Sequence, residues 1–143
     1  RPLPARSAEA MNRIFADAHF FFAILNPHDA AHPKATDFAR RSRGPLVTTA
    51  WVLTELADGL AMTPRRHAFR QVLEDLEANK ANLIVPANVE TFEKGVELYH
   101  ARPDKQWSLT DCISFVVMQD QGLREALTGD HHFTQAGFSM LLG

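Results

Sequence analysis

The chain has 143 residues, of which 45% are hydrophobic and 22% charged, and its formal net charge is −2. This length allows one domain with a sizeable core and is short for two, and the composition excludes a disordered chain or a coiled coil. The small net charge does not indicate a nucleic-acid-binding protein, although arginines cluster at 40–43 and 65–70. Cys112 is the only cysteine, which excludes an internal disulfide and a zinc site built on several cysteines and favours the reducing cytoplasm.

The longest apolar runs are far shorter than the ~20 residues that a membrane-spanning helix requires. We therefore expect no association with a membrane. Residues 1–10 precede Met11 and lack the apolar centre of a signal peptide, so we expect them to be an N-terminal extension or a cloning remnant. A single domain is predicted over residues 11–143.

The first half of the chain alternates short apolar runs with amphipathic ones. Pro33 lies in the helix expected at 29–42, and a helix tolerates proline only near its first turn. In chain order the expected elements are a strand at 13–16, a helix at 18–25, a turn at 26–29, a helix at 29–42, a strand at 45–49 and a helix at 50–61 that ends near Gly59.

The same alternation continues in the second half. Thr63 and Pro64 form an N-cap and first-turn signal, and Ser108 can cap a later helix. The expected elements are a helix at 63–80, a strand at 82–87, a helix from 88 to about 102, a helix at 108–119 and strands at 124–130 and 138–142. Strands separated by helices predict βαβ units, and the right-handed crossover rule then gives a parallel sheet covered on both faces.

Four isolated acids fall at positions where such a sheet gathers its ligands. Asp17 follows the first expected strand directly, and Asp130 follows the strand that begins at Arg124. Asp111 lies at the third position of the helix capped by Ser108. Glu55 lies one turn into the helix that follows residues 45–49. Because ligands bind beyond the carboxyl ends of parallel strands, we expect these four side chains to meet there.

Carboxylates that meet at one edge repel one another unless a cation lies between them. Mg²⁺ and Mn²⁺ accept oxygen ligands and need only one or two direct protein carboxylates for each ion. Such an ion lowers the pKa of a bound water and neutralises charge on a leaving oxygen. The pattern therefore indicates metal-assisted phosphoryl transfer, with one ion and two ions as open alternatives.

Each acid also has a purely structural interpretation. Asp17 and Asp130 could be turn formers, and Asp111 could be the acid of a capping box, a role compatible with metal binding. Glu55 is the least secure by pattern, because Asp58 lies three residues later and could share its face. Ser108 and Thr110 are caps first, with a second role in holding water or phosphate.

Histidine and arginine patterns give weaker indications. His131 and His132 are adjacent, so joint binding to one metal is disfavoured, and Pro33 disfavours the helix that would pair His28 with His32. A zinc site is therefore disfavoured. The arginine clusters are usually solvated faces, but near an acidic pocket they would supply phosphate contacts for an RNA strand.

The four acid-bearing segments, in this order, resemble the PIN domain family, and within it the VapC-like toxin ribonucleases and their stand-alone relatives. The resemblance covers residues 13–142. The segments are "RIFADAHFFFAILN", "LVTTAWVLTELADGL", "WSLTDCISFVVM" and "ALTGDHHFTQAGF". No single segment is very specific, but the ordered set with intervening helices is a fairly strong signal.

The resemblance implies a three-layer α/β/α sandwich around a central, mostly parallel sheet. It also implies a cytoplasmic endoribonuclease that uses Mg²⁺ or Mn²⁺ and leaves a 5′ phosphate. The three main acids of the family would be Asp17, Glu55 and Asp111, with Asp130 as the more variable fourth. A toxin of this kind would form a homodimer and would have a small antitoxin protein that blocks its pocket.

One departure from the family pattern concerns the residues after the first acid. The family often has Thr or Ser there, whereas this chain has Ala18 and His19. His19 could donate a hydrogen bond near phosphate, or it could indicate weakened activity. Arg40 and Arg41 are the arginines expected to contact phosphate.

Two rival functions follow from the same residues. The first is an inactive PIN module that binds RNA or protein without cutting, which the His19 departure favours. The second is a receiver-like phosphoacceptor, because such domains also gather acids at strand ends. The second is weaker, because the sequence has no lysine beyond the last strands to pair with a phosphoryl group.

Overall fold

The computed structural model describes residues 13–41 and 44–143. Its strands form one five-stranded sheet in the order β3-β2-β1-β4-β5, and every neighbouring pair is parallel. The elements are β1 (Ile14–Ala16), α2 (Ala18–Leu25), α3 (His32–Arg41), β2 (Leu46–Thr49), α4 (Ala50–Leu60), α5 (Ala68–Ala78), β3 (Leu83–Val85), α6 (Val89–Ala101), α7 (Leu109–Gln121), β4 (Glu125–Leu127), α8 (His131–Gln135) and β5 (Ser139–Met140). The α/β fold with a parallel central sheet is confirmed.

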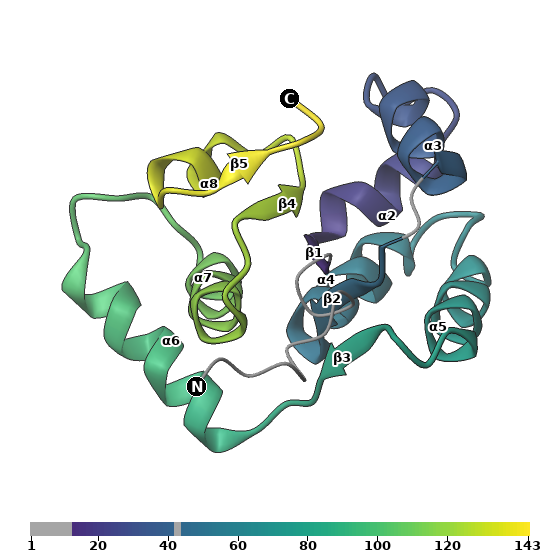
Figure 1. The fold of residues 1–143 in the computed structure, drawn as a ribbon. Coiled ribbons are helices and arrows are strands. Elements are labelled where there is room, and N and C mark those ends of the chain that lie inside the picture. The colour runs from purple at the N-terminus through teal and green to yellow at the C-terminus, as the bar shows by residue number, and fades with distance from the viewer. Residues whose placement is uncertain (1–12, 42–43) are drawn as a thin grey trace, which may run out of the picture.

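The strand order contains one reversal of direction. From β1 the chain adds β2 and then β3 on one side, and it later adds β4 and β5 on the other side (Figure 1). The reversal lies between β1 and β4, which pair through Phe15 with Ala126 and Ala16 with Leu127. In open α/β sheets this reversal is the point at which ligands bind, beyond the carboxyl ends of the two strands.

The strands are short and largely buried. Phe15, Val47 and Ala126 have no exposed surface. Around the sheet, α6 packs along α7, α7 contacts α4, and α2 contacts both α3 and α4. This packing fixes the starts of α2, α4 and α7, and each of these helices carries one of the predicted acids.

An aromatic cluster fills the core beneath the edge at which β1 and β4 end. Phe133 is completely buried, and its ring centroid lies 4.9 Å from that of Phe115 and 6.2 Å from that of Phe15. Trp107 packs edge-on against Phe115 at 5.0 Å. The cluster therefore joins β1 to the beginnings of α7 and α8, the elements that border the candidate site.

Several predicted elements differ in their bounds; the strands expected at 82–87 and 138–142, for example, are shorter. The helix expected from Thr63 begins only at Ala68, because Thr63 starts a turn instead: its hydroxyl accepts a hydrogen bond from the N–H of Arg65, and Ala68 bonds back to Arg65. The helix expected at 29–42 begins at His32, after a turn in which Asp29 accepts a hydrogen bond from the N–H of Ala31. The strand expected at 124–130 ends at Leu127, and α8, which follows it, was not predicted.

Two expectations concern residues outside the described part of the chain. The extension expected at residues 1–10 and the position of Arg43 both lie there. Within the described residues, every helix is too short or too polar to span a membrane.

Candidate active site

Asp17 lies at the reversal point, between the end of β1 and the start of α2. Its N–H donates to the carbonyl of Leu127 on the neighbouring strand, at 3.4 Å. Only 8% of its surface is exposed, so its carboxylate is largely cut off from water. A carboxylate at this depth needs hydrogen-bond donors or a cation to remain ionised.

The donor is Thr128, the first residue after β4. Its buried hydroxyl donates to Oδ2 of Asp17 at 2.9 Å and accepts from the N–H of Asp130 at 3.0 Å. A hydroxyl group from the end of the neighbouring strand therefore contacts the first acid. Sequence reasoning missed Thr128, and the one available signal was its position between a strand end and the acid at 130.

Asp111 forms the predicted capping box at the start of α7. Ser108 accepts from the N–H of Asp111 at 3.0 Å, and Oδ2 of Asp111 accepts from the N–H of Ser108 at 3.2 Å. The same Oδ2 lies 3.1 Å from Nδ1 of His132, a contact that the sequence did not predict. Capping thus fixes the backbone of Asp111, and His132 fixes one of its carboxylate oxygens.

Asp130 caps α8 and lies beside the same histidine. Its Oδ1 accepts from the N–H of His132 at 2.9 Å and lies 3.4 Å from Nδ1 of that residue. His132 therefore bridges Asp111 and Asp130, and it could do so only because the unpredicted α8 turns the chain back toward α7. No sequence pattern would indicate this contact. Asp111 is far from the other two residues in the chain, and Asp130 and His132 lie two positions apart, which is not helical spacing.

Glu55 lies in the second turn of α4, which begins at the N-cap Thr49. The pKa of Glu55 is raised to about 7, mainly by partial burial and also by repulsion from Asp17, Asp111 and Asp130. The side chain is nonetheless open to solvent. This repulsion means that Glu55, rather than Asp58, is the acid of α4 that faces the other three.

The pKa of Asp17 is raised to about 6. Burial is the largest cause, the hydrogen bonds from Thr128 and from the N–H of Ala18 oppose it, and repulsion from Asp111 and Asp130 adds to it. The structure therefore brings the four predicted acids within electrostatic range of one another. Among the described residues, no three of these acids have carboxylate oxygens that all lie within 4.8 Å of one another.

His19 and the other predicted contact residues have defined places. Nδ1 of His19 accepts a hydrogen bond from the N–H of Gly129, and a Cβ at position 129 would collide with the His19 ring. His19 therefore ties α2 to the loop after β4, and only its Nε2 is left to face a phosphate. Thr110 lies half-buried in the first turn of α7, whereas Arg40 and Arg41 lie on α3, each 3.0 Å from Asp37.

The donor set fits a hard divalent cation. Carboxylate oxygens are the ligands that Mg²⁺ and Mn²⁺ prefer, and the raised pKa of Asp17 reflects an ionised state that the protein alone does not stabilise. Asp130, His131 and His132 do lie within 4.8 Å of one another. That trio is less suited, because Oδ1 of Asp130 already caps α8 and the two histidines are adjacent in sequence.

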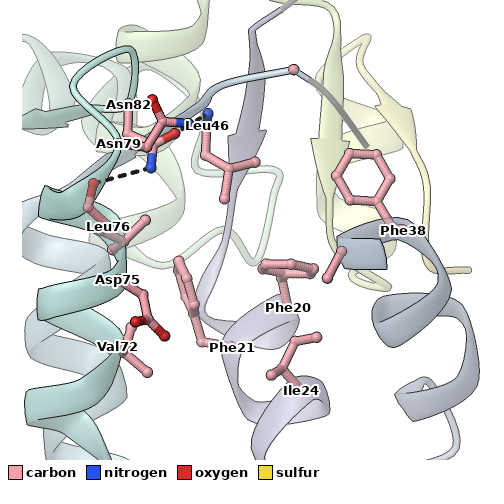
Figure 2. Close-up of a pocket in the computed structure, with 12 residues that line it drawn as sticks. Phe20, Phe21, Ile24, Phe38, Leu46, Val72, Asp75, Leu76, Asn79 and Asn82 are labelled. Atoms are coloured by element: carbon pink, nitrogen blue, oxygen red, sulfur yellow. Dashed lines mark hydrogen bonds between the residues drawn. The ribbon is translucent and has the colours of Figure 1, made fainter. Parts of the chain in front are cut away.

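A separate apolar pocket lies away from these acids, between α2, α3 and α5. Figure 2 shows Phe20, Phe21 and Ile24 rising from α2 toward this pocket. Asn82 closes one end, donating to the carbonyl of Leu76 at 3.0 Å and accepting from the N–H of Leu46 at 2.8 Å. None of the four acids lines this pocket, so it is not the site of their chemistry.

Replacing Thr128 with valine should leave the carboxylate of Asp17 without its side-chain donor. We expect the pKa of Asp17 to rise above about 6, because the hydrogen bond that lowers it is lost. We also expect the metal-free protein to lose about 1.5 kcal/mol of unfolding free energy at pH 8. Carboxyl carbon NMR titration and urea unfolding measure the two effects, and Thr54→Val, on the exposed face of α4, is the control. An unchanged pKa of Asp17 would contradict the role given to Thr128.

Comparisons with known proteins identify the family and the fold of the chain. The family model described as PIN domain matches residues 14–139. The 23S rRNA-specific endonuclease VapC20 of Mycobacterium tuberculosis (strain ATCC 25618 / H37Rv) is 28% identical over 129 residues, which cover 87% of this chain and 95% of that protein.

Two solved structures share the fold. The crystal structure of Mycobacterium tuberculosis VapC20, a sarcin-ricin loop cleaving toxin, has a TM-score of 0.78 at 24% identity and covers 87% of this chain and 95% of its own. A toxin–antitoxin complex from Klebsiella pneumoniae has a TM-score of 0.58 at 15% identity and covers 82% of this chain and 87% of its own. Because the family model spans most of the chain, from β1 to the start of β5, the protein belongs to the PIN domain family.

Proposed function

We propose that the protein is a divalent-metal-dependent endoribonuclease and the toxin of a toxin–antitoxin pair. The observation that carries this proposal is the convergence of Asp17, Glu55, Asp111 and Asp130 at the reversal point of the sheet. Its second support is the similarity to VapC20, a 23S rRNA-specific endonuclease, over nearly the whole of that protein. The reaction would be hydrolysis of an RNA phosphodiester bond, in the cytoplasm, leaving a 5′ phosphate.

Asp17, Asp111, Glu55 and Asp130 would hold Mg²⁺ or Mn²⁺. A bound ion of this type supplies an activated water and neutralises charge on the leaving oxygen. The buried position of Asp17 places one fixed carboxylate at the bottom of the site, and Glu55 provides a solvent-facing one. The ionised forms of both are required, so the site is complete only when the pH is above the raised pKa values.

The surrounding residues orient these acids. Thr128 holds Oδ2 of Asp17 at 2.9 Å, and Ser108 holds the backbone at Asp111. His132 holds one oxygen of Asp111 and lies beside Asp130, so these two carboxylates keep a fixed separation. Ser108, Thr110 and Nε2 of His19 are the polar groups that would meet water or phosphate at this edge.

Cleavage of a 5′-labelled RNA in the presence and absence of metal tests the proposal. We expect endonucleolytic products in Mg²⁺ or Mn²⁺, loss of all products in EDTA, and recovery when the metal is returned. The inactive PIN module predicts RNA binding without products under every condition. Products that persist in EDTA would exclude metal dependence, and their absence in both metals would exclude the nuclease.

The partner proposals rest on the same family relationship. We propose a small antitoxin protein, because a protein of this fold from Klebsiella pneumoniae occurs in a toxin–antitoxin complex. We also propose a homodimer, as the family resemblance implies. Sedimentation equilibrium of the full chain should give twice the mass of one chain, and a monomer at micromolar concentration would contradict it.

A further inference from the structure

A second hollow lies between the end of α6 and the start of α7, next to the N-cap of the helix that carries Asp111. Its volume is about 500 Å³, and Tyr99, His100, Arg102, Lys105, Trp107 and Ser108 are among the residues that line it. Ser108 belongs both to this wall and to the capping box of Asp111. A molecule bound in the hollow would therefore be separated from Asp111 by the side chain of Ser108.

The floor of the hollow is formed by residues of the α6–α7 connection, an aromatic ring with two cations above it. Trp107 is 6% exposed, and its indole N–H donates to the side-chain oxygen of Gln135 at 2.9 Å. The guanidinium carbon of Arg102 lies 5.2 Å from the centroid of the Trp107 ring, and Nζ of Lys105 lies 6.0 Å from it. Cations over an aromatic face are held there by the electrostatic field of the ring.

The two cations differ in how much of their charge is already neutralised. Arg102 makes two hydrogen bonds to Asp104, at 2.9 and 2.8 Å, and the Arg102 side chain holds the pKa of Asp104 at about 2. Lys105 takes part in none of the ion pairs found among the described residues. Lys105 is therefore the group that offers positive charge to an incoming anion.

The wall of the hollow provides an aromatic face. Tyr99 is 48% exposed, and its ring lies 5.9 Å from that of His100 in an edge-on arrangement. Lys105 acts on Asp104 only through longer-range attraction, so most of its charge is left for a phosphate. An exposed aromatic ring beside such a lysine is the combination with which proteins bind single-stranded nucleic acids, through base stacking and phosphate contact. Because the acids beside the hollow repel phosphates, an RNA strand needs such a cation close by.

We infer that this hollow binds one nucleotide of a single-stranded RNA, adjacent to the phosphodiester at the four acids. The base stacks on Tyr99, and Lys105 contacts the phosphate. The inference rests on the proposed function, because RNA is the substrate proposed there, but it concerns a site that the acids themselves do not define.

Binding of a short, fluorescein-labelled, single-stranded oligoribonucleotide to the full chain in EDTA tests the inference without cleavage. We expect Tyr99→Ala to weaken binding about tenfold, and Tyr99→Phe to restore most of it. We expect Lys105→Ala to weaken binding and to reduce the slope of log Kd against log salt by about 0.7, the loss of one phosphate contact.

Matched controls lie outside the hollow. Phe92 is on the same helix and is 42% exposed, and Lys80 is an exposed lysine before β3. Phe92→Ala and Lys80→Ala should bind within about twofold of the parent chain, since neither residue lines the hollow. Circular dichroism is the check that each variant is folded.

The outcomes separate this inference from the proposed function. Parent-like Kd and salt slope in both Tyr99→Ala and Lys105→Ala overturn the nucleotide site, even if the parent chain cuts RNA. Equal losses in the control variants also overturn it, because the effect is then general. Selective losses in EDTA support the site even if the parent chain cuts nothing in Mg²⁺, a result that would overturn only the nuclease.

Discussion

Asp111→Asn should abolish metal-dependent RNA cleavage while leaving the protein folded. The substitution removes one negative charge and one proposed metal ligand from the site, and the electrostatic contribution of a catalytic metal amounts to several kcal/mol, or a rate loss of at least about 100-fold. The measurement is the single-turnover cleavage rate of a labelled RNA in Mg²⁺.

The protein should stay folded because asparagine can take the place of Asp111 in the capping box. Its side-chain oxygen can accept the hydrogen bond from the N–H of Ser108, which Asp111 accepts at 3.2 Å. The N-cap itself, Ser108, is unchanged, so we expect the unfolding free energy to change by less than about 1 kcal/mol. Repulsion of Asp17 and Glu55 decreases at the same time, which lowers the pKa of both.

The matched control is Asp120→Asn, on the same helix. Asp120 is exposed and lies 3.5 Å from Lys94, a surface pair whose loss has little effect on stability. We expect Asp120→Asn to cut RNA at the parent rate. If Asp111→Asn cuts RNA at the parent rate, Asp111 has no role in catalysis and serves only in the capping box.

Asp17→Asn should stabilise the metal-free protein at pH 7.5 by about 2–3 kcal/mol. The pKa of Asp17 is raised from 3.8 to about 6 in the folded protein, and each pKa unit corresponds to about 1.4 kcal/mol. Asparagine resembles the protonated carboxyl in shape, and its oxygen can still accept from Thr128. Urea unfolding in EDTA at several pH values measures the difference.

The sign follows from proton linkage. The folded state binds the Asp17 proton more tightly than the unfolded state, so this group favours folding below about pH 4 and loses that contribution as the pH rises through about 6. The parent chain should therefore lose stability between pH 4 and pH 7, and Asp17→Asn should show a flatter profile. Glu55 acts in the same direction, since its pKa is raised to about 7.

Divalent metal should reverse the order of stability. Mg²⁺ at the proposed site would bind the ionised carboxylates, so its addition should stabilise the parent chain more at pH 7.5 than at pH 5.5, and should stabilise Asp17→Asn less. Glu74→Gln, an exposed acid of α5, is the control and should behave as the parent chain does. If Asp17→Asn and the parent chain have the same pH profile in EDTA, the carboxyl of Asp17 is not strained by burial.

Local sequence signals predicted much of the fold correctly. The helix that Ser108 caps and the strand that ends before Asp17 were both predicted, because capping and short apolar runs depend on residues close together in the chain. The prediction that failed at Thr63 depended on the same kind of signal. There the hydroxyl found a partner in a tight turn, and the helix started five residues later, at Ala68.

By itself, the sequence determined which acids follow strands or begin helices, and the rule for parallel sheets brought them to one edge. Only the tertiary structure decided what holds them there. Thr128 donates to Asp17 across the reversal point, from a position 111 residues later in the chain. His132 of α8 contacts Asp111, which lies 21 residues earlier. Such contacts leave no periodic trace in a sequence, because they depend on which strands become neighbours and on where the chain turns back, and both are set by packing of the whole core.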